Sequence, residues 1–319
     1  MIDVELLKSI LLYGVMTGGL YALLAVGFSL IYGVSEVTNL AHGALFMLGT
    51  YVFFFLATPY GGIQTNLFLA FILAAISVAI IGSILYRLTI DPVVEDPLMV
   101  MVVTISLAMI MQEVLVLGFG SYRQRVPSIG EELAKMLGTE DLVVVWGVKL
   151  TYSRILAFAL SIALFAVLLI YITKAKSGRA MRALSQDREV AMLMGINTGR
   201  LSMLAMAISA SFAAIAGVLI TSSTGGGVTY PHIWRTPLFM AFAIVVLGGL
   251  GSIKGAFVGA FIIGYIETIF SFAIDPIIAS ILNVPGGASL SGAVIMATML
   301  LVLFFRPKGL FGKRVELEE

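Results

Sequence analysis

Apolar residues occur along the chain in long unbroken runs that short polar stretches separate. A helix that crosses a membrane needs about 20 mainly apolar residues, and runs of this kind lie near residues 9–33, 43–57, 66–87, 98–118, 154–173, 201–221, 236–250, 253–272 and 288–305. The runs are continuously apolar, whereas the strands of a membrane barrel alternate apolar and polar residues. Because two of the runs are short, the pattern predicts an all-α polytopic membrane protein of about 8–10 transmembrane helices.

The composition favours the same class of protein. Of 319 residues, 60% are hydrophobic and 12% are charged, and the mean hydropathy is +1.07. A soluble domain has roughly 45–50% apolar and about 25% charged residues, so this composition excludes a soluble globular protein. The net charge of +1 gives no support for binding to nucleic acid. The absence of cysteine excludes disulfides and cysteine-ligated metals.

Lysine and arginine residues predict the orientation, because the cytoplasmic loops of membrane proteins carry the larger share of them. With residues 174–200 in the cytoplasm and nine crossings, 12 of the 19 basic residues lie inside. These are Arg87, Lys174, Lys176, Arg179, Arg182, Arg188, Arg200, Lys254, Arg306, Lys308, Lys313 and Arg314. We therefore expect an external N-terminus, a cytoplasmic C-terminus and an external loop at 119–153. The first run lacks a basic leader and a clear cleavage site, so we expect it to be retained.

The external loop contains one stretch with the character of a β-hairpin. Residues 141–151 read DLVVVWGVKLT, which is β-branched and apolar on both sides of Gly147. This pattern predicts a small hairpin on the outer face. The alternative is an irregular loop.

The polar stretch at 174–200 has the spacing of a short amphipathic helix. An apolar stripe is formed by Met181, Leu184, Val190, Ala191 and Met194, with charges of both signs on the other face. We expect glycines at 178 and 195 to bracket this helix and residues 197–199, Asn-Thr-Gly, to stop it. A helix of this kind docks into a groove on a partner through its stripe. The alternative is a solvated connector.

Polar residues interrupt two apolar runs, in SEVTNLAHG (35–43) and GGLGSIKG (248–255). The parallel suggests an internal repeat of two broken hairpins, and interrupted segments in corresponding positions indicate the pathway of a transporter. We therefore expect Thr38, Asn39 and His42 to line or gate the route. The alternative is a tight cytoplasmic turn with capped helix ends. The patterns Gly14-x-x-x-Gly18 and Gly255-x-x-x-Gly259 predict close helix packing.

Ionisable residues inside apolar runs cost at least ~2.5–3.5 kcal/mol when they face lipid, so they usually face the interior of a bundle. The candidates are Glu36, Glu113 and Glu267, together with the polar but uncharged Gln112. We expect Glu36 near the interface, and Glu113 and Glu267 deeper, either paired with a neighbouring helix or supplying polarity to the pathway.

Sequence motifs for chemistry or for nucleotide binding are missing from the chain. The segment GGLGSIKGAF (248–257) lacks the GK[ST] ending of a phosphate-binding loop, and no HExxH metal motif is present. We therefore expect neither an enzyme nor a resident cofactor or metal. If the protein pumps, its motor is on another chain.

The polar stretch also carries the motif by which the chain resembles a known family. GRAMRALSQDREVAMLMGI (178–196) resembles the cytoplasmic signature of branched-chain amino acid permeases of the ABC importer class. Residues 18–51 and 246–268 are similar to the N-terminal and C-terminal blocks of that family, and RPKGLFG (306–312) is similar to its ending. The resemblance covers nearly the whole chain and is closest to the H-type of the two paired permeases. The segment DPVVEDP (91–97) is more acidic than the family's arginine-containing segment at this place.

The resemblance implies a single permease domain, residues 1–319, in the plasma membrane of a prokaryote. It implies that residues 178–196 form a coupling helix that docks on an ATP-binding subunit. The positions that match the family motif are Gly178, Arg179, Arg182, Ala183, Asp187, Ala191, Gly195 and Ile196. The implied partners are the lipid bilayer, two cytosolic ATP-binding subunits, a second homologous permease and an external solute-binding protein.

The function that the resemblance implies is a pathway for leucine, isoleucine and valine, driven by ATP hydrolysis on separate subunits. One alternative within this class is an importer of urea or a short amide. An alternative from another class is an ion-coupled secondary transporter or channel, which would use Glu113 and Glu267 as ligands of the coupling ion.

Overall fold

The computed structural model describes residues 4–61, 64–139, 142–223, 227–282, 291–305 and 309–311. Every predicted apolar run forms a helix within these ranges, although residues 288–290 of the last run lie outside them. The helices are α1 (Val4–Ser35), α2 (His42–Ala57), α3 (Leu67–Leu85), α4 (Pro97–Phe119), α6 (Tyr152–Lys174), α9 (Thr198–Ser223), α10 (Arg235–Gly248), α11 (Ile253–Ile269) and α13 (Ser291–Phe305). The fold is therefore all-α and polytopic, as predicted.

Six helical segments of the described chain are long and apolar enough to cross a membrane. They are Val4–Ser35, Leu67–Val93, Pro97–Phe119, Tyr152–Lys174, Thr198–Ser223 and Ile253–Ile278. The third apolar run continues from α3 through a π-helical turn, η2 (Tyr86–Ile90), and a short 3-10 turn, η3 (Asp91–Val93). The eighth continues from α11 through a second π-helical turn, η4 (Phe270–Ile274), into α12 (Asp275–Leu282). Three apolar helices are shorter, His42–Ala57, Arg235–Gly248 and Gly292–Phe305.

The segment between α4 and α6 is more ordered than its sequence predicted. The expected hairpin is present as β2 (Leu142–Val145) and β3 (Val148–Thr151), joined by Trp146 and Gly147, which both have positive φ. A helix that we did not predict, α5 (Ile129–Leu137), precedes it. The hydroxyl of Ser128 accepts a hydrogen bond from the backbone N–H of Glu131 at 3.2 Å and so caps this helix. A short pairing of β1 (Gln124–Arg125) with β4 (Val228–Thr229) joins this segment to the chain after α9.

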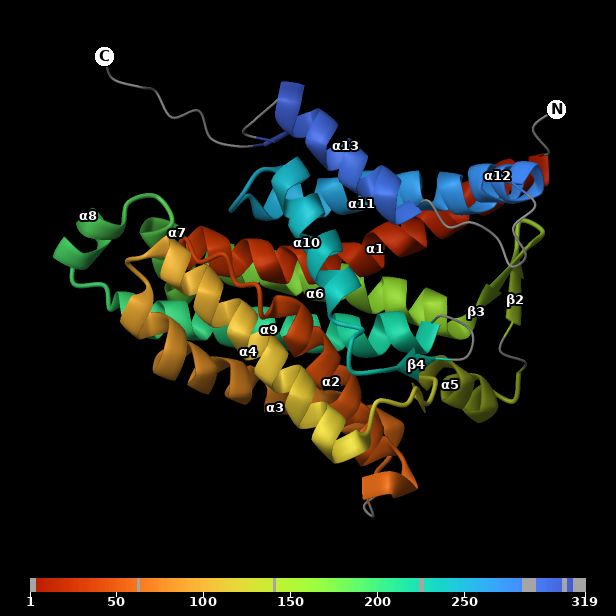
Figure 1. Ribbon diagram of the computed structural model, residues 1–319, viewed down its shortest axis with the longest axis horizontal. Helices are drawn as coiled ribbons and strands as arrows, with labels where there is room; N and C mark the ends of the chain where they lie inside the picture. Colours follow the sequence, from red (N-terminus) through yellow and green to blue (C-terminus); the bar gives the residue numbers. More distant parts are fainter. Residues whose placement is uncertain are drawn as a thin grey trace.

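Helix α1 lies in the centre of the bundle and packs on α11, α9, α6 and α10. In Figure 1, α1, α6, α9 and α11 run along the long axis of the molecule, and α3 and α4 form an outer layer on one side. Three glycines allow α1 and α11 to approach closely. A Cβ atom at Gly264 would lie 2.5 Å from the backbone nitrogen of Gly18, and one at Gly18 would lie 2.8 Å from the Cα atom of Phe261. Gly14 faces the ring of Tyr265 in the same contact.

The other predicted glycine pattern also lies at a close contact. Gly255 lies against the backbone of Gly248 at the turn between α10 and α11, and a Cβ atom at Gly259 would lie 2.9 Å from the carbonyl oxygen of Ile244. Both glycine patterns are therefore confirmed as sites where helices approach closely.

We predict that Gly264→Ala destabilises the protein, because the added methyl group meets the backbone of Gly18 rather than a side chain that can move away. Overpacking of this kind costs about 1–3 kcal/mol, so the thermal unfolding temperature in detergent falls. Gly118→Ala is the matched control, since nothing lies within 4 Å of its Cβ position. An equal unfolding temperature for the two variants would contradict the packing argument.

Candidate functional site

The polar loop between α6 and α9 contains two short helices rather than the single helix that we predicted. They are α7 (Lys176–Leu184) and α8 (Arg188–Leu193). The break between them is caused by Asp187, whose carboxylate accepts a hydrogen bond from the backbone N–H of Val190 at 2.9 Å and caps α8. An aspartate inside a predicted helix therefore begins a new helix here, and the chain changes direction before it.

Helix α7 is held tightly on the rest of the bundle. It packs on α6, α9 and α1, and it buries Met181 and Leu184. Gly178 lies within the helix rather than before it, and a Cβ atom there would lie 2.6 Å from the Cα atom of Ile172 and even closer to the carbonyl oxygen of Tyr171. The base of the loop is therefore fixed to the end of α6.

Helix α8 presents apolar side chains to the outside, which differs from the predicted stripe. Of the predicted stripe, Met181, Leu184 and Ala191 are buried, whereas Val190 and Met194 are 53% and 78% exposed. Together with Met192 and Leu193, which is 86% exposed, they form what we call the α8 tip. The five residues do not form one continuous stripe, because the loop is divided into α7 and α8. Figure 1 shows α8 at the end of the molecule opposite β2, β3 and α5.

The remaining motif positions surround this tip. Arg179, Arg182 and Asp187 are exposed, and Ala183 and Ile196 are half-buried. Gly195 ends α8 with a positive φ of 80°, as the predicted bracket requires. An exposed apolar tip edged by charged residues is typical of a surface that a partner covers. Docking of a partner at the α8 tip stays a prediction.

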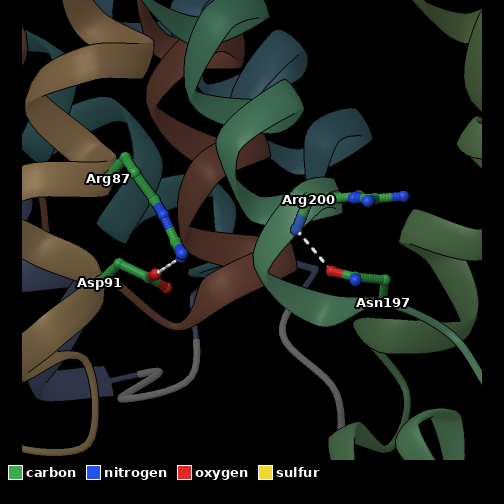
Figure 2. A network of polar contacts seen from close by, with 4 residues as sticks. All are labelled: Arg87, Asp91, Asn197 and Arg200. Carbon is green, nitrogen blue, oxygen red and sulfur yellow. Dashed lines mark hydrogen bonds and ion pairs between the residues drawn. The ribbon is translucent and has the colours of Figure 1, made fainter.

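We predicted that residues 197–199 end the amphipathic helix, but α8 already ends at Leu193. Residues 197–199 instead lie at the start of α9. The side-chain oxygen of Asn197 accepts a hydrogen bond from the backbone N–H of Arg200 at 3.0 Å, at the start of α9. An ion pair between Arg87 and Asp91 lies beside this start, and the Cβ position of Gly199 is 3.9 Å from an oxygen of Asp91. Figure 2 shows the side chain of Arg200 directed away from this ion pair.

Two aspartates of the acidic segment 91–97 make contacts within the structure. Asp91 pairs with Arg87 on the π-helical turn after α3. Asp96 caps α4, since its carboxylate accepts hydrogen bonds from the backbone N–H groups of Leu98 and Met99 at 2.9 and 3.2 Å.

Both predicted interruptions of the apolar runs are breaks between helices. The first follows Ser35 at the end of α1, where Glu36 has a positive φ of 57°, and ends where α2 begins at His42. The second lies between α10 and α11, where Gly249 and Gly251 have positive φ. The second break lies against the last turn of α1, because a Cβ atom at Gly33 would lie 3.0 Å from the carbonyl oxygen of Gly251.

The three predicted gate residues differ in their surroundings. Thr38 is half-buried, whereas Asn39 and His42 are fully enclosed. The Nε2 atom of His42 lies 3.0 Å from the carbonyl oxygen of Leu24 in α1, and its Nδ1 atom lies 3.4 Å from the hydroxyl of Ser209 in α9. His42 therefore joins three helices at the break. A role in gating remains a prediction for these residues.

The ionisable residues of the apolar runs are not gathered in one place. Glu36 is exposed, and Glu113 is exposed on α4 rather than directed into the bundle. Glu113 accepts a hydrogen bond at 2.9 Å from Gln112, which is itself buried and accepts one from Trp234 at 2.8 Å.

Glu267 instead lines a hollow of about 190 Å³, together with Arg154 at the start of α6. The predicted orientation counts Arg154 only as one of the seven basic residues on the external side. Its position in the first turn of an apolar run is the signal that marks it as close to the bundle.

Comparison with known proteins gives one consistent result. Residues 10–303 match the family described as the permease component of branched-chain amino acid transport systems. The high-affinity branched-chain amino acid transport system permease protein BraD of Pseudomonas aeruginosa is 29% identical over 95% of each chain. The corresponding protein LivH of Escherichia coli is 31% identical over 94% of each chain. The permease protein LivM of Salmonella typhimurium is 28% identical over 73% of this chain and 57% of its own length.

We predict that Gly178→Ala loosens α7, because the methyl group meets the backbone of Tyr171 and Ile172. The backbone amides of α7 then exchange with deuterium faster than in the parent protein, since the helix no longer packs tightly on α6. Gly199→Ala is the control, because the nearest atoms to its Cβ position are 3.9 Å away. Unchanged exchange in α7 of the Gly178 variant would show that the close contact does not hold the loop.

Proposed function

Because the chain belongs to the family of permease components of branched-chain amino acid transport systems, we propose that it is the permease subunit of an ABC importer for leucine, isoleucine and valine. The family match extends over most of the chain, and relatives with that printed role are similar over nearly their full lengths. ATP hydrolysis takes place on separate cytosolic subunits, and an external binding protein delivers the solute.

The second permease of the assembly is a different but homologous chain. This proposal is supported by the similarity to two types of relative, LivH over 94% of each chain and LivM over 73% of this chain. The chain takes the place of the LivH type. The pathway for the solute then lies between the two permeases, where each contributes the polar residues of its helix breaks.

The observation that carries the proposal is the α8 tip. Four apolar side chains, among them Leu193 at 86% exposed, stand on a polar loop with Arg179 and Arg182 beside them. Exposed apolar groups in such a cluster are stabilised when a partner covers them, and flanking charges fix the register of docking. An ATP-binding subunit with an apolar groove edged by acidic residues is the complementary partner.

Because α7 is packed against α6, a movement of the α8 tip is transmitted to the helix bundle. Helix α7 is fixed at the end of α6 by Gly178, and α9 begins directly after the loop at Asn197. Helix α9 contacts α1, α2 and α3, and Ser209 of α9 lies beside His42 at the break between α1 and α2. Movement of the loop therefore shifts the break residues Thr38, Asn39 and His42. We assign these residues to the gate.

The proposal places the loop in the cytoplasm, with the N-terminus outside and the C-terminus inside. The distribution of lysine and arginine supports this orientation. The hairpin of β2 and β3, at the other end of the molecule in Figure 1, is then on the external face.

We predict that Leu193→Glu abolishes coupling. A carboxylate in an apolar groove loses its hydration without gaining a partner, at a cost of several kcal/mol, so leucine uptake by cells that express all subunits falls more than tenfold. The ATP-binding subunit no longer copurifies with the variant. Leu137→Glu is the matched control, because Leu137 is exposed on α5 at the opposite end. Normal uptake and copurification in the Leu193 variant would contradict the assignment of the α8 tip.

A further inference from the structure

The hollow lined by Arg154 and Glu267 lies at the end of the molecule away from the α8 tip. It is enclosed by the first half of α1, the start of α6, the end of α9, and the end of α11 with its π-helical turn, and it measures about 190 Å³. Its polar lining consists of Tyr13, Thr17, Tyr21, Arg154, Ser223, Glu267, Thr268 and Ser271. A water molecule takes about 30 Å³ of liquid volume, so the hollow has room for a molecule of the size of a free amino acid.

The positive charge of the hollow is held in place but not neutralised. The Nε atom of Arg154 donates to the carbonyl oxygen of Ser223 at 3.4 Å, and its guanidinium carbon lies 4.6 Å from the centre of the Tyr13 ring. Among the residues that the structure describes, Arg154 has no carboxylate within 4.0 Å. A guanidinium group carries five N–H donors, so its terminal nitrogens remain available to a carboxylate in the hollow.

The negative charge lies across the same hollow on α11. Glu267 is within the electrostatic reach of Arg154 and close to the hydroxyl of Tyr21. Its Oε2 atom is buried and has no hydrogen-bond partner among the described residues. A buried acceptor without a donor is costly, and a ligand that donates to it removes this cost.

We propose that the hollow binds the charged backbone of a free amino acid, with the ammonium group on Glu267 and the carboxylate on Arg154. The hollow is lined by two opposite charges, which complement the two charges of a zwitterion. Urea or a neutral amide supplies no opposite charge to either side chain. The choice of an amino acid as ligand rests on the proposed function. In the proposed orientation the site is the first contact of the solute after it leaves the external binding protein.

The aliphatic side chain of the solute enters a neighbouring hollow. This second hollow measures about 230 Å³ and shares Tyr21 and Ile220 with the first. Its lining includes the apolar side chains Leu24, Phe46, Ile233 and Met240. The two hollows together give a polar place for the backbone and an apolar place for a branched side chain.

Saturation-transfer NMR on the full-length chain in lipid nanodiscs tests the site, with L-leucine, N-acetyl-L-leucine, L-leucinamide and urea as probes. For the parent protein we expect L-leucine to bind at least tenfold more tightly than the other three, since each of them lacks one or both charges. Glu267→Gln and Arg154→Gln each weaken binding of L-leucine about tenfold. N-acetyl-L-leucine, which lacks the ammonium group, is affected by Arg154→Gln but not by Glu267→Gln.

The controls are Glu132→Gln and Lys135→Gln, which remove exposed charges on α5 outside the hollow. They leave L-leucine binding within twofold of the parent. The analogue comparison uses the parent protein alone, so it decides the question even if a variant fails to fold. Equal binding of all four probes, or no binding of L-leucine, overturns the site. Failure of ATP-driven uptake with L-leucine binding intact would instead overturn the proposed function and leave the site standing.

Discussion

Close contact between helix backbones is the constraint on which this structure depends. Lipid is as apolar as the helix surfaces, so association within a membrane relies on packing rather than on the hydrophobic effect. Gly264 and Gly18 let α11 and α1 touch along their backbones, and Gly49 does the same for α2 against Ala214 of α9. Helix α1 is fixed in the middle of α6, α9, α10 and α11, and the α8 tip and the hollow of Arg154 and Glu267 lie at opposite ends of this bundle.

The two ends carry different chemistry, and the rigid bundle lies between them. At one end the α8 tip offers apolar side chains on a polar loop. At the other, Arg154 and Glu267 face one small hollow. The turn between α10 and α11 lies against the last turn of α1, where Gly251 faces Gly33. A subunit that is moved from one side and receives a small charged solute on the other needs this separation of a docking surface from a solute site.

The sequence predicted the elements whose signal is local and missed those that depend on tertiary contacts. Continuous apolar runs located the helices, and the turn residues located both breaks and the hairpin. Local caps could also have revealed two missed features, since Ser128 begins α5 and Asp187 splits the polar loop. The exposed face of Glu113 could not be predicted, because α4 is apolar on all sides. That Arg154 and Glu267 line one hollow depends on the packing of α6 and α11 around α1, which no local pattern encodes.

The energy source of transport tests the central claim most directly. The chain is reconstituted in proteoliposomes with its second permease, the ATP-binding subunits and the binding protein, and uptake of radiolabelled leucine is measured after ionophores have collapsed all ion gradients. The account predicts uptake that requires ATP and every subunit. Uptake by this chain alone, driven by an ion gradient in the absence of ATP, would contradict it.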